Sequence, residues 1–150
     1  FQTDSTRVIT YRQPVTPLLQ SWGINIAAHT LSHYKRSRIK ESQLKDFKSM
    51  ELFSGLIDLF KNTPDVNGQS LFDNSLISYG TNIRQTHSLK GCPAIYTGGA
   101  ASKLKRGEHI ILPEEDTPLA NYWLTLCQQS GVEMDSFSHS TGTLNKLIRS

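Results

Sequence analysis

The chain has 150 residues, of which 37% are hydrophobic, and this proportion supports a modest core. Its formal net charge of +3 is mild and excludes neither an ordinary enzyme nor a nucleic-acid partner. No apolar run is long enough to span a membrane. The chain opens on Phe1-Gln2-Thr3-Asp4 without a basic segment or an initiator Met, so we expect no signal peptide within it. We therefore expect a piece of a longer protein.

The N-terminal part of the chain predicts a strand followed by a long loop. The β-branched run at 7–11 is bounded by polar residues and is typical of a strand. Residues 12–38 lack a sustained hydrophobic period and contain three chain-breaking residues, namely Pro14, Pro17 and Gly23. Long loops in compact domains are usually functional or disordered, so this segment is a place to look for a site.

The clearest helix is expected from about residue 39 to residue 62. Apolar side chains recur there at steps of three and four residues, with charged residues between them. The segment at 63–68 contains Pro64 and several turn-forming residues, which predict the end of the helix.

Three short apolar runs predict strands in the second half, at 76–80, 94–99 and 109–112. A second amphipathic helix is expected to begin at Thr117-Pro118 and to end at Gly131. Strands separated by amphipathic helices predict an α/β fold with a largely parallel sheet flanked by helices. In such sheets, ligands bind beyond the carboxyl ends of the strands.

The segment His29-Thr30-Leu31-Ser32-His33-Tyr34 places two imidazoles four residues apart, in a chain with only five histidines. Neutral imidazole is the commonest protein ligand for transition metals, and this spacing puts both rings on one face of a helix. His29 and His33 could therefore bind one divalent metal, with Ser32 as a hydrogen-bonding neighbour. The alternative is a structural loop in which the imidazoles bond to backbone carbonyl groups.

A third histidine follows the predicted strand at 76–80. His87 is the natural third ligand, and the alternative is a loop histidine that faces solvent. Asn82 could bind the metal or an oxyanion through its amide, although Asn is also ordinary turn chemistry there. Arg84 is the expected anion-binding residue, because a guanidinium group suits tetrahedral oxyanions. No Asp or Glu lies close to these histidines in the sequence.

The densest basic run is Lys35-Arg36-Ser37-Arg38 together with Lys40. Such a run can attract a phosphate group or a nucleic-acid backbone through its charge. A solvated start of the following helix is the interpretation we favour, because charge runs usually face water and aromatic residues do not interleave with this one. We do not expect a nucleic-acid partner.

The segment from His29 to His33 resembles the signature of the HXXSHH family, a group of uncharacterised bacterial proteins named for that motif. The resemblance extends over nearly the whole chain, in the segments 1–7, 76–87, 116–121 and 136–142. Members of the family are longer than this chain. The resemblance therefore implies that residues 1–150 form the C-terminal part of a single larger α/β domain.

The family is similar to the alkaline phosphatase and sulfatase superfamily. That similarity implies an alkaline-phosphatase-like fold with a divalent metal (zinc, manganese, iron or calcium) and an anionic ester as substrate. The resemblance also implies export to the periplasm or the cell exterior, and a nucleophile and acidic ligands supplied by the N-terminal part. The site residues it points to are, for the metal, His29, His33 and His87 and, for the substrate, Arg84, Asn82 and Ser32.

Two departures from the family pattern matter for function. Tyr34 stands where the motif has its final histidine, and the loop before His87 is shorter than in the family. One hypothesis is a metal-dependent hydrolase of phosphate or sulfate esters. The alternative is a non-catalytic binding or structural module of the cell envelope that retains the fold, and Tyr34 favours it slightly. Whether the chain belongs to an enzyme is left open by the sequence.

Overall fold

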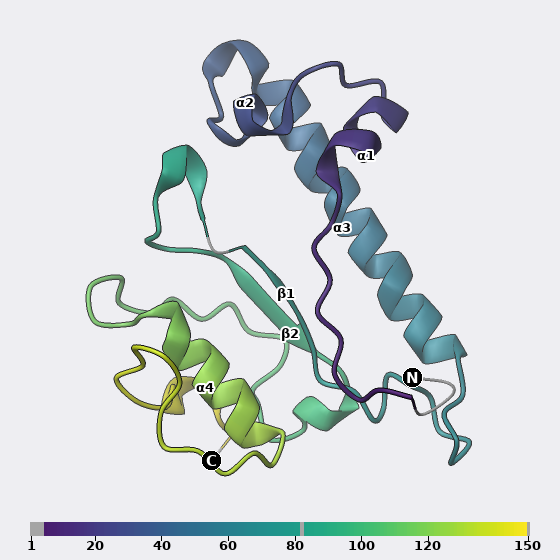
Figure 1. Ribbon diagram of the computed structural model, residues 1–150, viewed down its shortest axis with the longest axis vertical. Coiled ribbons are helices and arrows are strands. Elements are labelled where there is room, and N and C mark those ends of the chain that lie inside the picture. The colour runs from purple at the N-terminus through teal and green to yellow at the C-terminus, as the bar shows by residue number, and fades with distance from the viewer. Residues whose placement is uncertain (1–4, 82, 150) are drawn as a thin grey trace. The chain divides into compact units, whose positions relative to one another are not determined.

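The computed structural model describes residues 5–81 and 83–149, and the chain divides into two compact units (Figure 1). The first unit comprises Phe1–Leu71 together with Arg84–Ser88, and the second comprises Phe72–Ile83 and Leu89–Ser150. Each unit has its own small cluster of buried apolar side chains. The segment that carries His87 belongs to the same unit as the segment that carries His29 and His33.

The first unit is helical. Its elements are the helices α1 (Val15–Ser21), α2 (Ala28–Ser32) and α3 (Ile39–Asn62), with a turn of 3-10 helix at Arg36–Arg38. The long predicted helix is confirmed. The turn predicted after it is confirmed as well, because the Asp65 carboxylate accepts hydrogen bonds from the backbone nitrogens of Asn67 and Gln69.

The long loop predicted for residues 12–38 is wrong, because α1 and α2 form within it. Pro14 caps α1 and Pro17 lies in its first turn, where a proline removes no intrahelical hydrogen bond. Gly23 follows the helix with φ +73°, a left-handed conformation that glycine adopts without strain. The residues that the sequence presents as breakers therefore begin and end a helix.

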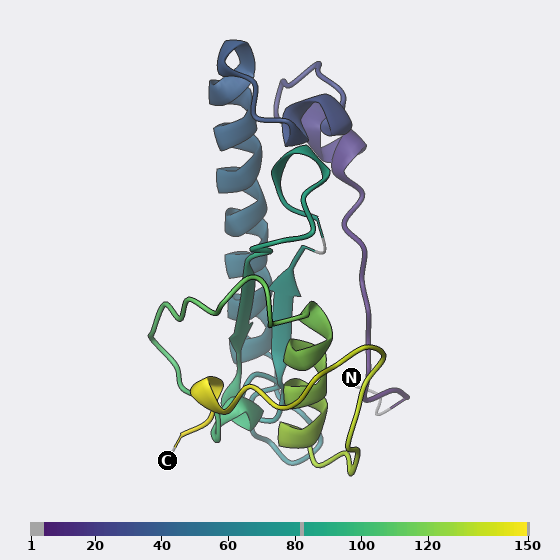
Figure 2. The same ribbon diagram turned by 90° about the vertical axis from the view of Figure 1, so that its left-hand side faces the viewer.

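A small core joins α1 and α2. Leu19, Ile24 and Leu31 are buried in it, and Trp22 packs against it. The hydroxyl of Ser42, which is fully buried on α3, donates a hydrogen bond of 2.9 Å to the carbonyl oxygen of Leu31. Figure 2 shows α1 and α2 beside the N-terminal end of α3. This bond fixes α2 against α3.

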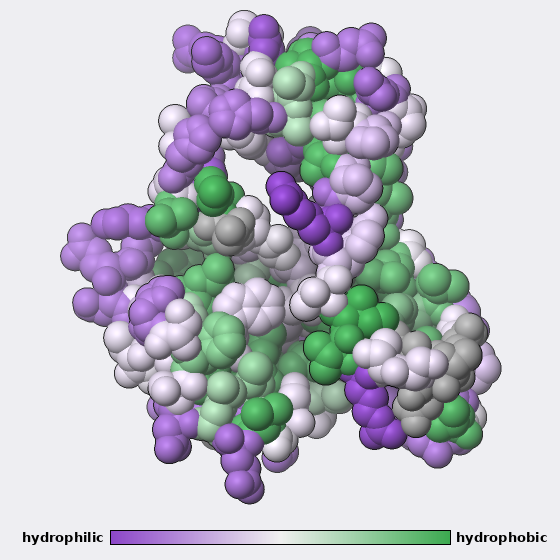
Figure 3. Space-filling model, viewed as in Figure 1, coloured by the Kyte–Doolittle hydropathy of each residue, from purple (hydrophilic) through white to green (hydrophobic). Residues whose placement is uncertain are grey.

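Most of α3 is exposed, and Ser42 is its one buried residue. Apolar side chains reach the surface along the helix, and green hydrophobic patches are interspersed with purple hydrophilic ones in the space-filling view (Figure 3). The exposed apolar residues of α3 are Leu44, Phe47, Met50, Leu52, Leu56 and Leu59. The periodicity predicted the helix, but its apolar stripe does not form a buried core.

The second unit contains a two-stranded sheet and one longer helix. Strand β1 (Ile77–Gly80) pairs antiparallel with β2 (Ala94–Thr97), with Ile77 opposite Thr97 and Gly80 opposite Ala94. Helix α4 (Leu119–Gln129) packs against the strands, since the Tyr122 hydroxyl lies 2.7 Å from the Ser78 hydroxyl. Short 3-10 turns lie at Gln85–His87, in the part of the β1–β2 loop that belongs to the first unit, and at Gly99–Ala101 and Asn145–Leu147. The predictions of both strands and of α4 are confirmed.

The predicted fold class is wrong. The described residues hold a two-stranded antiparallel sheet, not a largely parallel sheet flanked by helices as in an alkaline-phosphatase-like α/β fold. A parallel pair needs a crossover, usually through a helix, whereas the described residues between Gly80 and Ala94 contain a short 3-10 turn, and the strands run antiparallel. The prediction treated two strands joined by a long loop as though a crossover joined them.

Two predicted strands do not form. The run at 7–11 is irregular, with Val8 79% exposed, and the run at 109–112 is also irregular. Ile110 and Leu112 nevertheless pack against the core of the second unit. A short apolar run indicates burial, but a strand also needs a neighbouring strand to pair with.

Among residues 5–81 and 83–149, no helix combines the length and the hydrophobicity needed to cross a lipid bilayer. This agrees with the absence of a long apolar run in the sequence.

Candidate metal centre

The short helix α2 directs two histidines to one side. Leu31 lies midway between His29 and His33 and is fully buried. Because each residue of a helix turns the chain by about 100°, side chains two positions before and after Leu31 point away from its core face. Burial of Leu31 therefore places the two imidazoles together on the outer face, with His29 exposed and His33 half-buried.

His87 is presented by a tight turn between β1 and β2. The backbone nitrogen of Arg84 donates 2.7 Å to the carbonyl oxygen of Ser88, and the nitrogen of Ser88 donates 3.2 Å to that of Gln85. The side-chain amide of Gln85 then reaches the carbonyl oxygen of His33 at 3.5 Å. This long hydrogen bond joins the turn to the end of α2.

The backbone is strained next to these histidines. Thr86 has φ +56° and ψ +43°, His87 has φ +62°, and Tyr34 has φ +49°. The left-handed region is uncommon for residues with a Cβ atom and unusual for a β-branched one, and each such residue costs about 1–3 kcal/mol. Such conformations persist where surrounding contacts fix them, and here they turn His87 toward α2.

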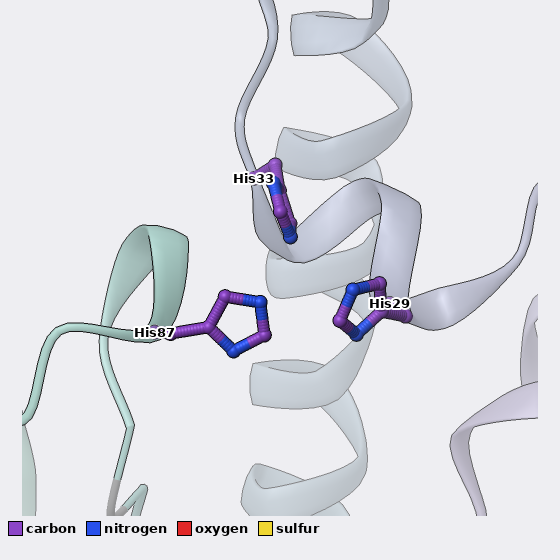
Figure 4. A group of neighbouring side chains, drawn as sticks. All are labelled: His29, His33 and His87. Carbon is purple, nitrogen blue, oxygen red and sulfur yellow. The ribbon is translucent and has the colours of Figure 1, made fainter.

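The structure brings together the three histidines named from the sequence. Ring centroids lie 4.9 Å apart for His29 and His33, 5.0 Å for His29 and His87, and 5.1 Å for His33 and His87. One nitrogen of each ring lies within 4.8 Å of the other two. Figure 4 shows the three rings turned toward a common space, two from α2 and one from the turn.

The environment of His33 favours its neutral form, the form that binds metals. Burial lowers the pKa of His33 from its ordinary value of 6.5, and electrostatic interaction with the neighbouring basic groups of His29, His87 and Lys35 lowers it further. Its Nε2 atom is buried and has no hydrogen-bond partner among the described residues. A buried polar atom without a partner is costly, and a metal ion at this position would remove that cost.

The donor set fits a metal ion. With zinc–nitrogen bonds of about 2.1 Å, two imidazole nitrogens on a tetrahedral ion lie about 3.4 Å apart. The nitrogens here lie within 4.8 Å, so the rings must close slightly, and His29 and His87 are exposed and able to rotate. Three imidazoles, two from α2 and its C-terminal end and one from the turn, match the protein ligands of an open site with three ligands.

The other predicted site residues, Ser32, Arg84 and Asn82, do not belong to the group of three imidazoles. The hydroxyl of Ser32 donates 2.7 Å to the carbonyl oxygen of His29, so it holds the helix that carries both imidazoles. Arg84 is exposed and begins the turn that carries His87. Asn82 lies outside the described residues. The ring of Tyr34, which follows His33 directly, lies 5.6 Å from the Lys45 ammonium group.

Two residues that position the site were not foreseen from the sequence. Ser42 fastens α2 through the carbonyl of Leu31, and Gln85 links the turn to His33. For Ser42, a small polar residue within an apolar helical pattern is a weak sign of a buried hydrogen bond. The sequence gives no such sign for Gln85, because its role depends on a contact with a distant segment.

Comparisons with protein-family models, with curated proteins and with solved structures found no match to this chain. The interpretation of the site therefore depends on its own residues and geometry.

Proposed function

We propose that His29, His33 and His87 bind a divalent metal ion, and that the protein uses this centre to hydrolyse phosphate or sulfate esters. The observation that carries the proposal is the convergence of three imidazole nitrogens to within 4.8 Å from segments far apart in the sequence. Structural zinc sites usually have four protein ligands, whereas catalytic sites have three and keep a position open for substrate or water. This group offers three.

The resemblance to the HXXSHH family supports a proposal about the whole protein to which this chain belongs. We propose on this basis that the chain is the C-terminal part of a longer bacterial protein exported to the periplasm or the cell exterior. The nucleophile and any acidic ligands would then come from residues that precede this chain.

The residues of this chain have distinct roles in the proposed reaction. A divalent metal at the site would act as a Lewis acid that polarises the ester and lowers the pKa of a bound water or nucleophile. His33 supplies a neutral imidazole held by α2, and His87 closes the site from the turn. Arg84, on the same turn as His87, provides a guanidinium group for the oxygens of the ester.

Metal analysis tests the proposal most directly. We expect elemental mass spectrometry of the purified full-length protein to find about one bound transition-metal ion, lost in the His29→Ala, His33→Ala double variant. His139→Ala is the matched control, because His139 is an exposed histidine of the second unit and bonds only to its neighbour Ser138 among the contacts that the structure describes. Hydrolysis of p-nitrophenyl phosphate or p-nitrophenyl sulfate should disappear with the metal. Metal content that the double variant retains would contradict the assignment.

A non-catalytic module of the cell envelope is the second candidate. The group contains no carboxylate, and the ring that replaces the last histidine of the motif lies against Lys45 instead. Metal that is bound through the three histidines, in a full-length protein that hydrolyses neither ester, would favour this module over the enzyme.

A further inference from the structure

We propose that the three-histidine group selects a transition-metal ion of the zinc type over magnesium, calcium and manganese, and that the bound ion takes an anion as its exchangeable ligand. The inference rests on the metal centre proposed above and narrows both the metal and the ligand class that it accepts.

The donor atoms set the metal class. Carboxylate, carbonyl and water oxygens suit magnesium, calcium and manganese, whereas imidazole suits zinc, copper, iron and nickel. The group formed by His29, His33 and His87 contains nitrogen donors and no carboxylate from the described part of the chain. An oxygen-preferring ion would have to take its ligands from water or from the backbone.

Three backbone carbonyl groups of α2 and its C-terminal end already accept hydrogen bonds. The carbonyl oxygen of His29 accepts from Ser32, and that of His33 accepts from Gln85. The carbonyl of Leu31 accepts from both Ser42 and the nitrogen of Tyr34. A calcium-type ion would therefore have to share these oxygens with the bonds that hold α2 and the turn in place, or displace those bonds, whereas an imidazole-bound ion leaves them intact.

The charge of the group sets the ligand class. Three neutral imidazoles leave a divalent ion with its full charge, in contrast to sites in which thiolates or carboxylates neutralise it. Lys35, two residues along the chain from His33, adds a positive charge next to the group. An anion in the open position compensates both charges, and because His29 and His87 are exposed, that anion can exchange with solvent.

A titration of the metal-free chain with Co²⁺, followed by visible absorption, tests the inference. We expect saturation near one equivalent with the intense bands of a low-coordinate nitrogen site, displacement of Co²⁺ by Zn²⁺, and no displacement by millimolar Mg²⁺, Ca²⁺ or Mn²⁺. Added inorganic phosphate should shift the bands. His87→Ala should weaken Co²⁺ binding by more than the roughly 10–100-fold that loss of a supporting group costs. His87 is exposed on a turn, so this variant should fold, and His139→Ala should bind as the unchanged chain does.

The possible outcomes separate this inference from the proposed function. Displacement by Mg²⁺, Ca²⁺ or Mn²⁺, or unchanged binding in His87→Ala, would overturn the selectivity, even if the full-length protein hydrolyses esters. Bands that phosphate does not alter would overturn the anion ligand. The expected selectivity in a protein without ester hydrolysis would support the inference and contradict the enzymatic proposal. Absence of any metal binding would contradict both.

Discussion

A buried polar network in the second unit contrasts with one buried ring nitrogen in the first unit. In the second unit, Thr125 is fully buried, and its hydroxyl donates 2.7 Å to the carbonyl of Asn121 and accepts 2.8 Å from the nitrogen of Leu144. The Asn121 amide bonds Thr141 through both its oxygen and its nitrogen, at 2.7 and 2.9 Å. In the first unit, Nε2 of His33 is buried without a partner among the described residues.

This difference separates a structural role from a binding role. Buried polar groups are normally hydrogen-bonded, and the network around α4 satisfies this rule. Its role is to stabilise the fold of the second unit. We attribute the unpartnered imidazole of His33, which lies beside two others, to the shared ligand proposed above. The following experiments should therefore separate loss of folding from loss of metal binding.

The largest effect is expected for Leu31→Ala. Leu31 is fully buried and orients α2, so its truncation should cost about 2–5 kcal/mol of stability and weaken Co²⁺ binding as well. Leu124→Ala is the matched control, because Leu124 is equally buried but lies on α4 in the second unit. It should lose comparable stability and keep its affinity for the metal.

Each unit contains one of the two tryptophans, Trp22 in the first and Trp123 in the second. Urea unfolding in Trp22→Phe and Trp123→Phe backgrounds therefore reports on the units separately. Equal loss of Co²⁺ affinity in the Leu31 and Leu124 variants would mean that the metal site does not depend specifically on α2.

Alkaline pH should destabilise the second unit through Tyr122. Burial raises the pKa of Tyr122 from 10.0 to about 12, in spite of its hydrogen bond to Ser78. Below pH 10 the folded and unfolded chains both keep the phenol proton, so the ionisation of Tyr122 does not make stability change with pH. As the pH rises toward 12, the unfolded chain loses the proton first, so stability falls, by up to about 2–3 kcal/mol once both forms are ionised.

The measurement is urea unfolding of the second unit between neutral and alkaline pH, with Tyr122→Phe as the reference. Tyr122→Phe should show a flatter decline, because it has no proton to lose at this position. Identical pH profiles in the two proteins would refute the role given to Tyr122.

Thr125→Val should cost about 1–3 kcal/mol, because valine keeps the shape of the side chain but leaves the buried nitrogen of Leu144 without its acceptor. The structural network has no part in metal binding, so Co²⁺ affinity should stay unchanged. Urea unfolding and Co²⁺ titration of the same sample check both statements, and a coupled loss of affinity would contradict the separation of the two roles.

The elements that the sequence predicted are those defined by local pattern. The amphipathic periods of α3 and α4 and the compact apolar runs of β1 and β2 need only neighbouring residues to be recognised. Pairing is not local. Whether β1 and β2 run parallel depends on the path of the chain between Gly80 and Ala94, which the pattern does not encode.

The grouping of the three histidines was predicted in part for a reason that does not hold. The spacing of His29 and His33 suits the helix that carries them. His87 was placed at the end of a parallel strand, whereas it lies in the loop of an antiparallel pair and reaches the other two through a strained turn. The residues that hold these segments, Ser42 and Gln85, act across long stretches of chain, so no local pattern reveals them.

The smallest effect is expected for Ser42→Ala. The substitution removes the hydroxyl that donates to the Leu31 carbonyl. That carbonyl still accepts from the nitrogen of Tyr34, so the loss of stability should be about 0.5–1.5 kcal/mol. Because that bond fixes α2 on α3, the Kd for Co²⁺ should also rise, by no more than about tenfold. Ser49→Ala removes a comparable hydroxyl bond further along α3 and should leave the affinity unchanged. Equal affinity in both variants would show that the Leu31 core alone orients the histidines.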